Sequence, residues 1–387
     1  LELIIYFLGI DGKDLHELRE LNKLVPKNAT VLILYGGGSV KKYGTLEKAI
    51  QSLPEREIVE FAGIEPNPKY TTLMKAVAVV KKEKMAFLLA VGGGSVMDGT
   101  KFVALAAGYD GNPEKLLTYG FMPVPVKTAL PMGTVVTLPA TGSEMNSGGV
   151  ISHNGGKFPV FSPLVFPKFS VLDPTLTYTL PPIQVANGII DTFIHTVEQY
   201  VTIPAEGRFQ DRTAEGILRT LIEVGKKTMD YPTDDGARAN LVWCATYALN
   251  GLIGAGVPQD WTTHMIGHEL TAMFGIDHGQ TLAILQPSIW KVRKEQKREK
   301  LLQYADRVWD ITEGDEDSRI DLAIEKTRAF FEDLGVSTRL SAYGVTKDKI
   351  DDIIKALETH KLTKLSETGD VTLDVSRKIL EDALGVE

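Results

Sequence analysis

The stretch that decides the fold is Ala86-Phe-Leu-Leu-Ala-Val91, an apolar run that leads directly into the turn Gly92-Gly-Gly-Ser95. The same arrangement occurs upstream, where Val31-Leu-Ile-Leu-Tyr35 leads into Gly36-Gly-Gly-Ser39. Short apolar runs of this kind are typical of strands that are buried on both faces, and glycines permit a tight turn into a helix. Each stretch therefore predicts a strand, a turn and a following helix.

Other strand and helix patterns alternate around these two stretches. We expect further strands at 58–61, 134–138 and 169–172, and helices near 44–51, over 70–82 and up to 107. Such alternation predicts parallel β-α-β units, with helices on both faces of the sheet. Beyond Pro181-Pro182 the pattern is almost entirely that of amphipathic helices, including 211–224, 300–309 and 320–334, the last with Gly335 at its end. We therefore expect an α/β domain over residues 1–181 and an all-α domain over residues 182–387.

The bulk composition suits an ordinary globular protein of two domains. Of the 387 residues, 43% are hydrophobic and 24% charged, and the net charge of -8 argues against a nucleic-acid partner. The single cysteine, Cys244, excludes an internal disulfide and suits the cytoplasm. The first residues lack a basic n-region, so no secretory signal is expected, and the missing initial Met leaves the true start open. The uncharged span 239–259 contains glycines and asparagines, so we expect a buried core helix and a loop, without a membrane partner.

Four polar residues have the spacing of a metal site. In Gly188-Ile-Ile-Asp-Thr-Phe-Ile-His195, Asp191 and His195 are four residues apart, so a helix projects both from one face. Further imidazoles come from His264, His268 and His278, and spacing alone leaves open which two of them complete the site. Three imidazoles and one carboxylate suit Fe(II) or Zn(II) better than Ca(II) or Mg(II).

The remaining titratable residues of these segments are expected to have lesser roles. Glu198 and Glu269 are expected to be ordinary helix carboxylates or partners behind the ligands. His16, His153 and His360 stand apart from the cluster and are expected at the surface.

The two glycine turns indicate a nucleotide site. Backbone N–H groups at such turns bind phosphate, and two turns at one edge of a parallel sheet favour a dinucleotide, although neither turn has the G-x-G-x-x-G pattern. No carboxylate follows the first strand, and Ser39 with Lys41 or Lys42 could bind a 2′-phosphate, so NADPH is the expected cofactor. The loop 141–149, rich in Gly, Ser and Asn, is a further candidate ligand contact.

The chain resembles a known family at several of these motifs. The segments 188–195, Gly254-Ala-Gly-Val-Pro-Gln-Asp-Trp261, His264-Met-Ile-Gly-His268 and Gly275-Ile-Asp-His-Gly279 are similar to those of the iron-containing (group III) alcohol dehydrogenases. The segments 35–42 and Glu65-Pro-Asn-Pro68 resemble the bacterial branch of NADPH-dependent aldehyde reductases and butanol dehydrogenases. The likeness runs from about residue 30 to the C-terminus.

The resemblance carries specific implications for the site. It implies the metal ligands Asp191, His195, His264 and His278, with His268 beside the nicotinamide as the catalytic residue. It implies cofactor contacts at Gly37, Gly38, Ser39, Asn67, Gly93, Gly94, Ser95, Asp98, Thr137, Thr141, Asn146 and Lys157. It also implies a dehydroquinate synthase-like two-domain fold, in which residues 1–181 form a Rossmann-like dinucleotide-binding domain and residues 182–387 an all-helical metal-binding domain, with the active site in the cleft. The implied metal is Fe(II) or Zn(II), and the implied assembly is a homodimer.

The expected reaction is the reversible reduction of a small aliphatic aldehyde to a primary alcohol, with His268 relaying a proton to the alkoxide. The apolar residues around the metal-site segments, such as Ile189, Phe193 and Phe274, favour an aliphatic substrate. A lyase or cyclase of the dehydroquinate synthase type and a glycerol dehydrogenase-like enzyme are alternatives within the same architecture. A non-catalytic nucleotide-binding sensor is an alternative of a different class.

Overall fold

The computed structural model describes residues 4–7 and 17–385, and these form two compact units. The first unit contains the described residues up to Leu180 together with Pro232–Thr246. The second contains Pro181–Tyr231 and the described residues from Tyr247 onward. The expected boundary at 181 lies where the chain first leaves the α/β unit, but nothing in the sequence pattern indicated that 232–246 returns to it.

The first unit is built on a six-stranded sheet in which every pairing is parallel. The strand order is β1-β8-β5-β4-β2-β3. The strands are β1 (Ile4–Phe7), β2 (Thr30–Tyr35), β3 (Glu57–Phe61), β4 (Phe87–Gly92), β5 (Met132–Val136) and β8 (Phe169–Leu172). The predicted parallel sheet is thus confirmed, and β5 lies two residues earlier than the pattern indicated.

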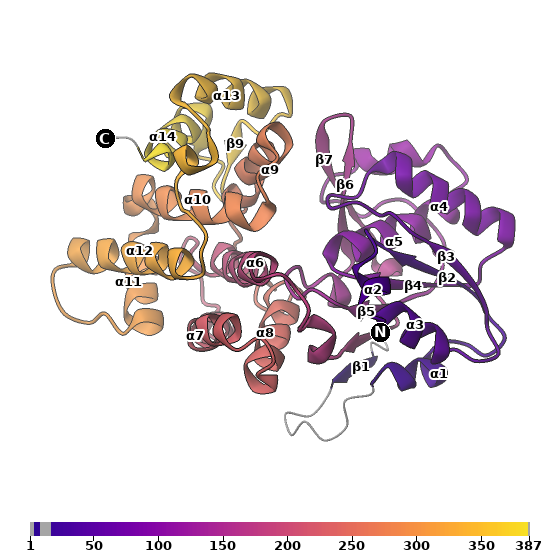
Figure 1. The fold of residues 1–387 in the computed structure, drawn as a ribbon. Coiled ribbons are helices and arrows are strands. Elements are labelled where there is room, and N and C mark those ends of the chain that lie inside the picture. The colour runs from indigo at the N-terminus through magenta and orange to yellow at the C-terminus, as the bar shows by residue number, and fades with distance from the viewer. Residues whose placement is uncertain (1–3, 8–16, 386–387) are drawn as a thin grey trace. The chain divides into compact units, whose positions relative to one another are not determined.

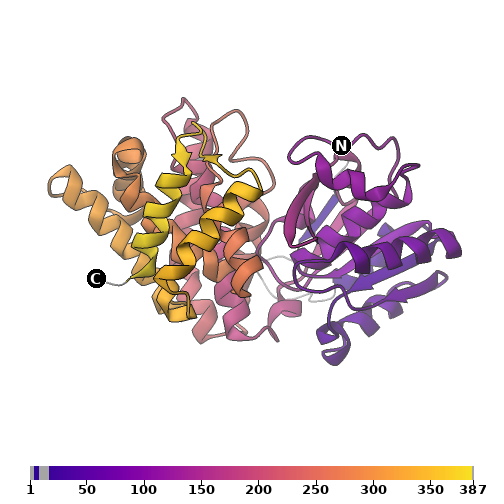
Figure 2. The same cartoon turned by 90° about the horizontal axis from the view of Figure 1, so that it is seen from above.

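Helices cover both faces of this sheet (Figures 1 and 2). Alternate residues of β2 point to opposite faces: Leu32 and Leu34 join one core, and Val31 and Ile33 join the other. The first core is closed by α4 (Tyr70–Glu83) and α5 (Gly94–Ala107), and α8 (Asp235–Ala248) adds Val242 to it. The second is closed by η1 (Glu17–Glu20), α1 (Leu21–Leu24) and α3 (Thr45–Gln51), while α2 (Ser39–Lys42) follows the first glycine turn.

An antiparallel hairpin that was not predicted lies beside α5. It consists of β6 (Gly148–His153) and β7 (Gly156–Phe161), joined at Asn154 and Gly155, which both have positive φ. Asn-Gly is the preferred pair for such a two-residue turn, so the signal was present in the sequence. The short 3-10 turns of this unit are η2 (Pro113–Thr118), η3 (Ser143–Met145), η4 (Pro163–Val165) and η5 (Pro174–Thr177).

The second unit is almost wholly helical and is organised around α6 (Pro182–Tyr200). Every residue of α6 from Gly188 to Tyr200 is buried, because α7 (Arg208–Asp230), α9 (Thr262–Phe274) and α10 (His278–Val292) pack against it. The remaining elements are α11 (Lys294–Trp309), α12 (Glu316–Asp333), η6 (Leu340–Tyr343), η7 (Lys347–Lys349), α13 (Ile350–Thr359), β9 (Lys364–Leu365), β10 (Val371–Thr372) and α14 (Leu373–Leu384). The pair β9–β10 is a small departure from the expected all-α unit.

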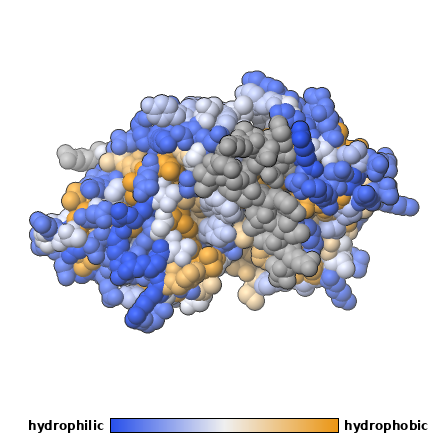
Figure 3. Space-filling model, turned by 90° about the horizontal axis from the view of Figure 1, so that it is seen from below, coloured by the Kyte–Doolittle hydropathy of each residue, from blue (hydrophilic) through white to orange (hydrophobic). Residues whose placement is uncertain are grey.

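The face drawn in Figure 3 is mostly hydrophilic, with apolar residues in scattered patches. Among the residues that the structure describes, no helix has the length and hydrophobicity needed to span a membrane. Cys244 is buried, and this burial raises the pKa of its thiol to about 12, so it is not a reactive thiolate at neutral pH. Of the histidines expected at the surface, His153 and His360 are partly exposed and pair with glutamates, while His16 lies outside the described residues.

Candidate active site

Two of the candidate ligands come from one face of the buried helix α6. Asp191 and His195 are separated by one helical turn, and the Asp191 Oδ1 atom lies 3.5 Å from His195 Nε2. The Thr192 and Thr196 hydroxyls, which follow the two ligands in sequence, donate to the carbonyl oxygens four residues earlier, and these buried polar groups are thus satisfied within the helix. The helix therefore presents the carboxylate and the imidazole together, as their spacing predicts.

The first turn of α9 is held against α6 by Glu198. The Glu198 Oε1 atom accepts hydrogen bonds from the backbone N–H groups of Thr263 (2.7 Å) and His264 (3.2 Å). These are N–H groups that lack partners within the helix, and the negative carboxylate also suits the positive end of the helix dipole. Asp260 caps the same turn by accepting from the Thr262 N–H at 3.0 Å. His264 is therefore placed by a carboxylate of the helix that carries the other two ligands.

His278 enters the cluster because α10 approaches α6 at a glycine. A Cβ atom added to Gly279 would lie 2.6 Å from the backbone oxygen of Asn187, which is too close for any other residue. The Asn187 side chain also donates to Asp277 Oδ2 at 3.1 Å. Gly279 is thus the reason why the segment Gly275-Ile-Asp-His-Gly279 can bring an imidazole to the face of α6.

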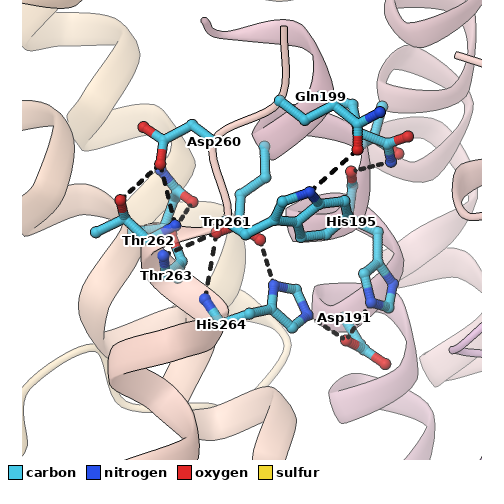
Figure 4. A network of polar contacts seen from close by, with 12 residues as sticks. Asp191, His195, Gln199, Asp260, Trp261, Thr262, Thr263 and His264 are labelled. Carbon is cyan, nitrogen blue, oxygen red and sulfur yellow. Dashed lines mark hydrogen bonds and ion pairs between the residues drawn. The ribbon is translucent and has the colours of Figure 1, made fainter. Parts of the chain in front are cut away.

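The geometry converges on one carboxylate oxygen. The Nε2 atoms of His195, His264 and His278 lie 3.5, 3.6 and 3.7 Å from Asp191 Oδ1. Figure 4 shows three of these four side chains facing one another within the polar network around the start of α9. All but His278 are buried, and the His278 side chain is 27% exposed, which leaves the cluster open on that side.

These residues fit a divalent metal ion. Asp191 Oδ1 and His264 Nε2 are buried and have no hydrogen-bond partner, and buried polar atoms without partners are rare in proteins. Burial alone would lower the pKa of His264, but the Glu198 and Asp191 carboxylates outweigh it and raise that pKa to about 9, so the site favours a cation. Asp191, His195 and His264 form a buried group with ligand atoms close enough to share one ion. The donor set of nitrogen and oxygen atoms suits Fe(II) or Zn(II).

His268 lies next to this cluster. Its ring stacks on that of His278 with the centroids 5.4 Å apart, and its centroid is 6.2 Å from that of His264. Sequence spacing left His264, His268 and His278 equivalent, whereas the structure brings His264 and His278 to Asp191. This arrangement is consistent with the roles that the family resemblance implied.

The two Gly-Gly-Gly-Ser turns differ although their sequences match. At the first turn, Gly37 and Gly38 face open space and Gly38 has φ +103°, a conformation that favours glycine. At the second turn the glycines are packed, since a Cβ on Gly94 would lie 2.5 Å from the Thr141 side chain. The first turn therefore has room for a ligand at its backbone, while the second brings the start of the 14-residue helix α5 against a loop.

Among the other predicted cofactor contacts, Asn67 and Thr137 are hydrogen-bonded to the second turn. The backbone N–H of Asn67 donates to Ser95 Oγ at 3.3 Å, and that of Thr137 donates to the carbonyl oxygen of Gly92 at 3.0 Å. Since β2, β4 and β5 are adjacent and parallel, the residues after their carboxyl ends share one edge of the sheet. Asp98 lies one turn into α5, Asn146 in the loop that precedes β6, and Lys157 on β7.

The surroundings of the first turn differ from the expectation in one respect. No carboxylate follows β2 in sequence, but Glu60 of the neighbouring strand β3 lies 3.0 Å from Lys41 Nζ. Tyr35 also donates a hydrogen bond to Glu60 at 2.8 Å, and the Lys41 ammonium lies over the Tyr35 ring. Lys41 is therefore already paired with an anion, whereas the Lys42 ammonium lies over the Tyr43 ring.

Of two further buried residues near these sites, Lys101 was not singled out by the sequence, and Glu198 was expected only as an ordinary helix carboxylate or a partner behind the ligands. Lys101 on α5 binds the loop before β6, and Glu198 has the specific contacts with α9 described above. A lysine in a buried stretch of helix, Val96 to Ala106, was the available signal for Lys101. The spacing of Glu198, three residues after His195, was the signal that it faces the same cluster.

The chain belongs to the iron-containing alcohol dehydrogenase family. The model "Iron-containing alcohol dehydrogenase" matches residues 13–174, and "Fe-containing alcohol dehydrogenase family, C-terminal" matches residues 185–372. Within that family the chain is 58% identical over 367 residues to the NADPH-dependent aldehyde reductase YqhD of Escherichia coli, covering 94% of each chain. The crystal structure of E. coli K-12 YqhD superposes with a TM-score of 0.92, covering 95% of this chain and 94% of that one. NADH-dependent butanol dehydrogenase B of Clostridium acetobutylicum is 40% identical, covering 89% of this chain and 88% of its own length.

Proposed function

We propose that this protein is a metal-dependent, NADPH-linked oxidoreductase that reduces small aliphatic aldehydes to primary alcohols and can run in reverse. The observation that carries the proposal is the set of three imidazole nitrogens around the unpartnered Asp191 oxygen. Membership of the iron-containing family and the 58% identity to an NADPH-dependent aldehyde reductase support the same chemistry.

Asp191, His195, His264 and His278 hold one divalent ion. When bound, that ion supplies Lewis acidity to a carbonyl oxygen and stabilises the negative charge that develops on it. Glu198 orients His264, because its carboxylate contacts the Nδ1 atom and leaves Nε2 directed at Asp191. His268, beside His278, delivers the proton that the alkoxide needs, since imidazole exchanges protons readily near neutral pH.

The nucleotide binds at the shared sheet edge of the α/β unit. Gly37, Gly38, Gly93 and Gly94 allow backbone contact with the phosphates, and Ser39 and Ser95 add hydroxyl donors. Because Lys41 is engaged by Glu60, Lys42 together with Ser39 is assigned to the 2′-phosphate. Asn67, Asp98, Thr137, Thr141, Asn146 and Lys157 complete the contacts.

The enzyme acts as a homodimer in the cytoplasm, in keeping with the family resemblance and the single buried cysteine. Light scattering during size-exclusion chromatography tests the assembly. A mass close to twice the chain mass of 42.4 kDa supports the dimer, and a mass close to 42.4 kDa contradicts it.

The reaction is tested by following NADPH oxidation with butanal. Protein stripped with a chelator is assayed alone, with Fe(II), with Zn(II), and with Mg(II) as a hard-cation control. Activity that returns with Fe(II) or Zn(II) and stays absent with Mg(II) supports the proposal. Inactivity with all three ions refutes it and directs attention to a lyase or a sensor, beginning with a search for tightly bound nucleotide.

A further inference from the structure

A lysine of the α/β unit is buried in the middle of α5 and bonded to a loop. Lys101 is 1% exposed, and its Nζ atom lies 2.8 Å from each of three oxygens: Ser143 Oγ, Asn146 Oδ1 and the carbonyl oxygen of Gly148. An ammonium group has three N–H donors, so each donor has an acceptor. Lys101 therefore binds the segment 143–148 at three points.

Asp98, one turn earlier on α5, binds Ser143 at the start of this segment and Val150 just beyond its end. Its Oδ1 atom accepts from the Ser143 hydroxyl at 2.7 Å, and its Oδ2 atom accepts from the Val150 N–H at 2.9 Å. Gly149 packs directly on Asp98, because an added Cβ would lie 3.1 Å from the Asp98 Cα atom. Both charged residues of this turn of α5 are thus used to hold the loop.

The loop is also tied to the sheet and to α8. The Ser170 hydroxyl on β8 donates to the Glu144 carbonyl oxygen at 2.7 Å and accepts from Thr134 of β5 at 2.8 Å. The Thr246 hydroxyl donates to the Glu144 carboxylate at 2.6 Å. The conformation of the loop is therefore fixed from three sides.

Lys101 is charged at neutral pH. Burial lowers its pKa to about 8, while Asp98 and Glu144 act in the opposite direction. A buried ammonium is costly unless it is fully hydrogen-bonded, as it is here. All three acceptors of this buried charge belong to one loop, which indicates that the conformation of the loop is important for function.

We propose that Lys101 is a positioning residue for nucleotide binding, which acts by fixing the Asn146 amide and the 143–148 backbone. This inference depends on the proposed function, because Asn146 and Thr141 are assigned there as nucleotide contacts. Asn146 Oδ1 accepts from both Lys101 Nζ and the Gly148 N–H, the latter at 3.1 Å. These two donors determine which end of the amide is the acceptor and turn its Nδ2 group away from the lysine.

The test compares Lys101→Met with Lys300→Met in the metal-loaded protein. Lys300 is a matched control, because it is 4% exposed and paired with Asp211 at 2.7 Å in the helical unit. NADPH affinity is measured by fluorescence titration, and metal content is checked by elemental analysis. We expect Lys101→Met to weaken NADPH binding about 10- to 100-fold, the range for lost hydrogen bonds to a charged group, with metal content unchanged. Lys300→Met should leave NADPH affinity within about twofold of wild type.

Kinetics separate positioning from general damage. We expect the KM for NADPH to rise in Lys101→Met, while the KM for butanal and the kcat at saturating NADPH stay close to wild type. Partial unfolding would instead lower kcat and leave both KM values unchanged. Combining Lys101→Met with Asn146→Ala should add little to either change alone, because the two residues act through one contact.

If Lys101→Met does not fold, the Ser143→Ala variant is tested in its place. This substitution removes the hydroxyl that links Lys101 to Asp98 and leaves the Lys101 charge intact. A smaller weakening of NADPH binding, about 3- to 10-fold, supports the proposal. Unchanged NADPH affinity in a folded Lys101→Met protein, or in Ser143→Ala where that variant decides, overturns it. If the wild-type protein binds no NADPH, the proposed function is wrong. This outcome differs from unchanged NADPH affinity in the variants, which contradicts only the role of Lys101.

Discussion

Two buried charges, one in each unit, have opposite surroundings. In the helical unit, three imidazole nitrogens face the Asp191 oxygen at 3.5–3.7 Å, and this oxygen accepts no hydrogen bond. In the α/β unit, three oxygens surround the Lys101 ammonium at 2.8 Å each, and every donor is used. In both clusters three groups surround one charged group, but only the Lys101 ammonium has all of its hydrogen bonds formed within the cluster.

This difference in hydrogen bonding distinguishes a binding site from a purely structural cluster. Buried polar atoms without partners cost stability, and in the Asp191 cluster two of them, Asp191 Oδ1 and His264 Nε2, face one another. The Asp191 cluster therefore has the features of a site that an ion completes, as we propose, whereas the hydrogen bonds of the Lys101 ammonium are already formed. The following predictions test this comparison, beginning with the largest expected effect.

Removing a ligand should abolish metal binding. We expect His264→Ala to lose both the bound ion and aldehyde reduction, because one of four donors and the Glu198 contact disappear. His268→Ala is the matched variant on the same helix, and it should keep the ion while turnover falls about 100-fold or more, as for loss of a general acid. Elemental analysis after desalting, with parallel assays, measures both. Metal loss in His268→Ala would show that the ligand set is assigned wrongly.

Removing the charge should affect stability to different extents at the two clusters. We expect Lys101→Met to lower the free energy of unfolding by about 3–5 kcal/mol, because it leaves the Asp98 carboxylate without its nearby positive charge and three loop oxygens without their donor. Asp191→Asn in the metal-free protein should lower it by only about 1 kcal/mol, because Asp191 Oδ1 accepts no hydrogen bond and the Glu198 carboxylate still faces His264. Urea unfolding of both variants without metal provides the comparison. If the two variants lost the same free energy of unfolding, the proposed difference between the Asp191 and Lys101 clusters would be wrong.

Weakening the orientation of His264 should reduce metal affinity without abolishing it. Glu198→Gln retains the shape of the side chain but removes the charge that faces Nδ1 and the start of α9. We expect about 10- to 100-fold weaker binding, the range found for partners behind metal ligands. Competition with a chromophoric chelator gives the affinity, and Glu269→Gln, whose carboxylate contacts His360, is the control. Unchanged metal affinity in Glu198→Gln would show that Glu198 acts only as a cap of α9 and does not orient His264.

The smallest effect is expected at the first glycine turn. Lys42→Met should reduce the preference for NADPH over NADH several-fold, because one cation near the 2′-phosphate is lost. Lys41→Met should change it less, since Lys41 is neutralised by Glu60. The ratio of kcat/KM values for the two cofactors measures this, and a larger change at Lys41 would reverse the assignment.

Much of the architecture could be predicted from local patterns. The apolar runs that end in glycine turns predicted β2 and β4, and their alternation predicted the parallel sheet. The Asn154-Gly155 hairpin was missed although its turn signal was present. The return of 232–246 to the first unit could not be predicted, because it depends on contacts between residues far apart in sequence, such as Thr246 with Glu144.

The two halves of the site were predictable to different degrees. Helical spacing placed Asp191 and His195 together, because a single helix determines their geometry. It could not choose between His264, His268 and His278, since that choice depends on how Glu198 and Gly279 position the neighbouring helices. Likewise, identical glycine turns gave no indication that one is open and the other packed against Thr141.

The most direct test of the central claim is an anomalous difference map from crystals of the protein loaded with Fe(II) or Zn(II), recorded at the absorption edge of the metal. The account predicts a single strong peak per chain in contact with Asp191, His195, His264 and His278, with His268 outside the coordination sphere. A peak coordinated by His268 instead of His278, or no peak within this cluster, would contradict it.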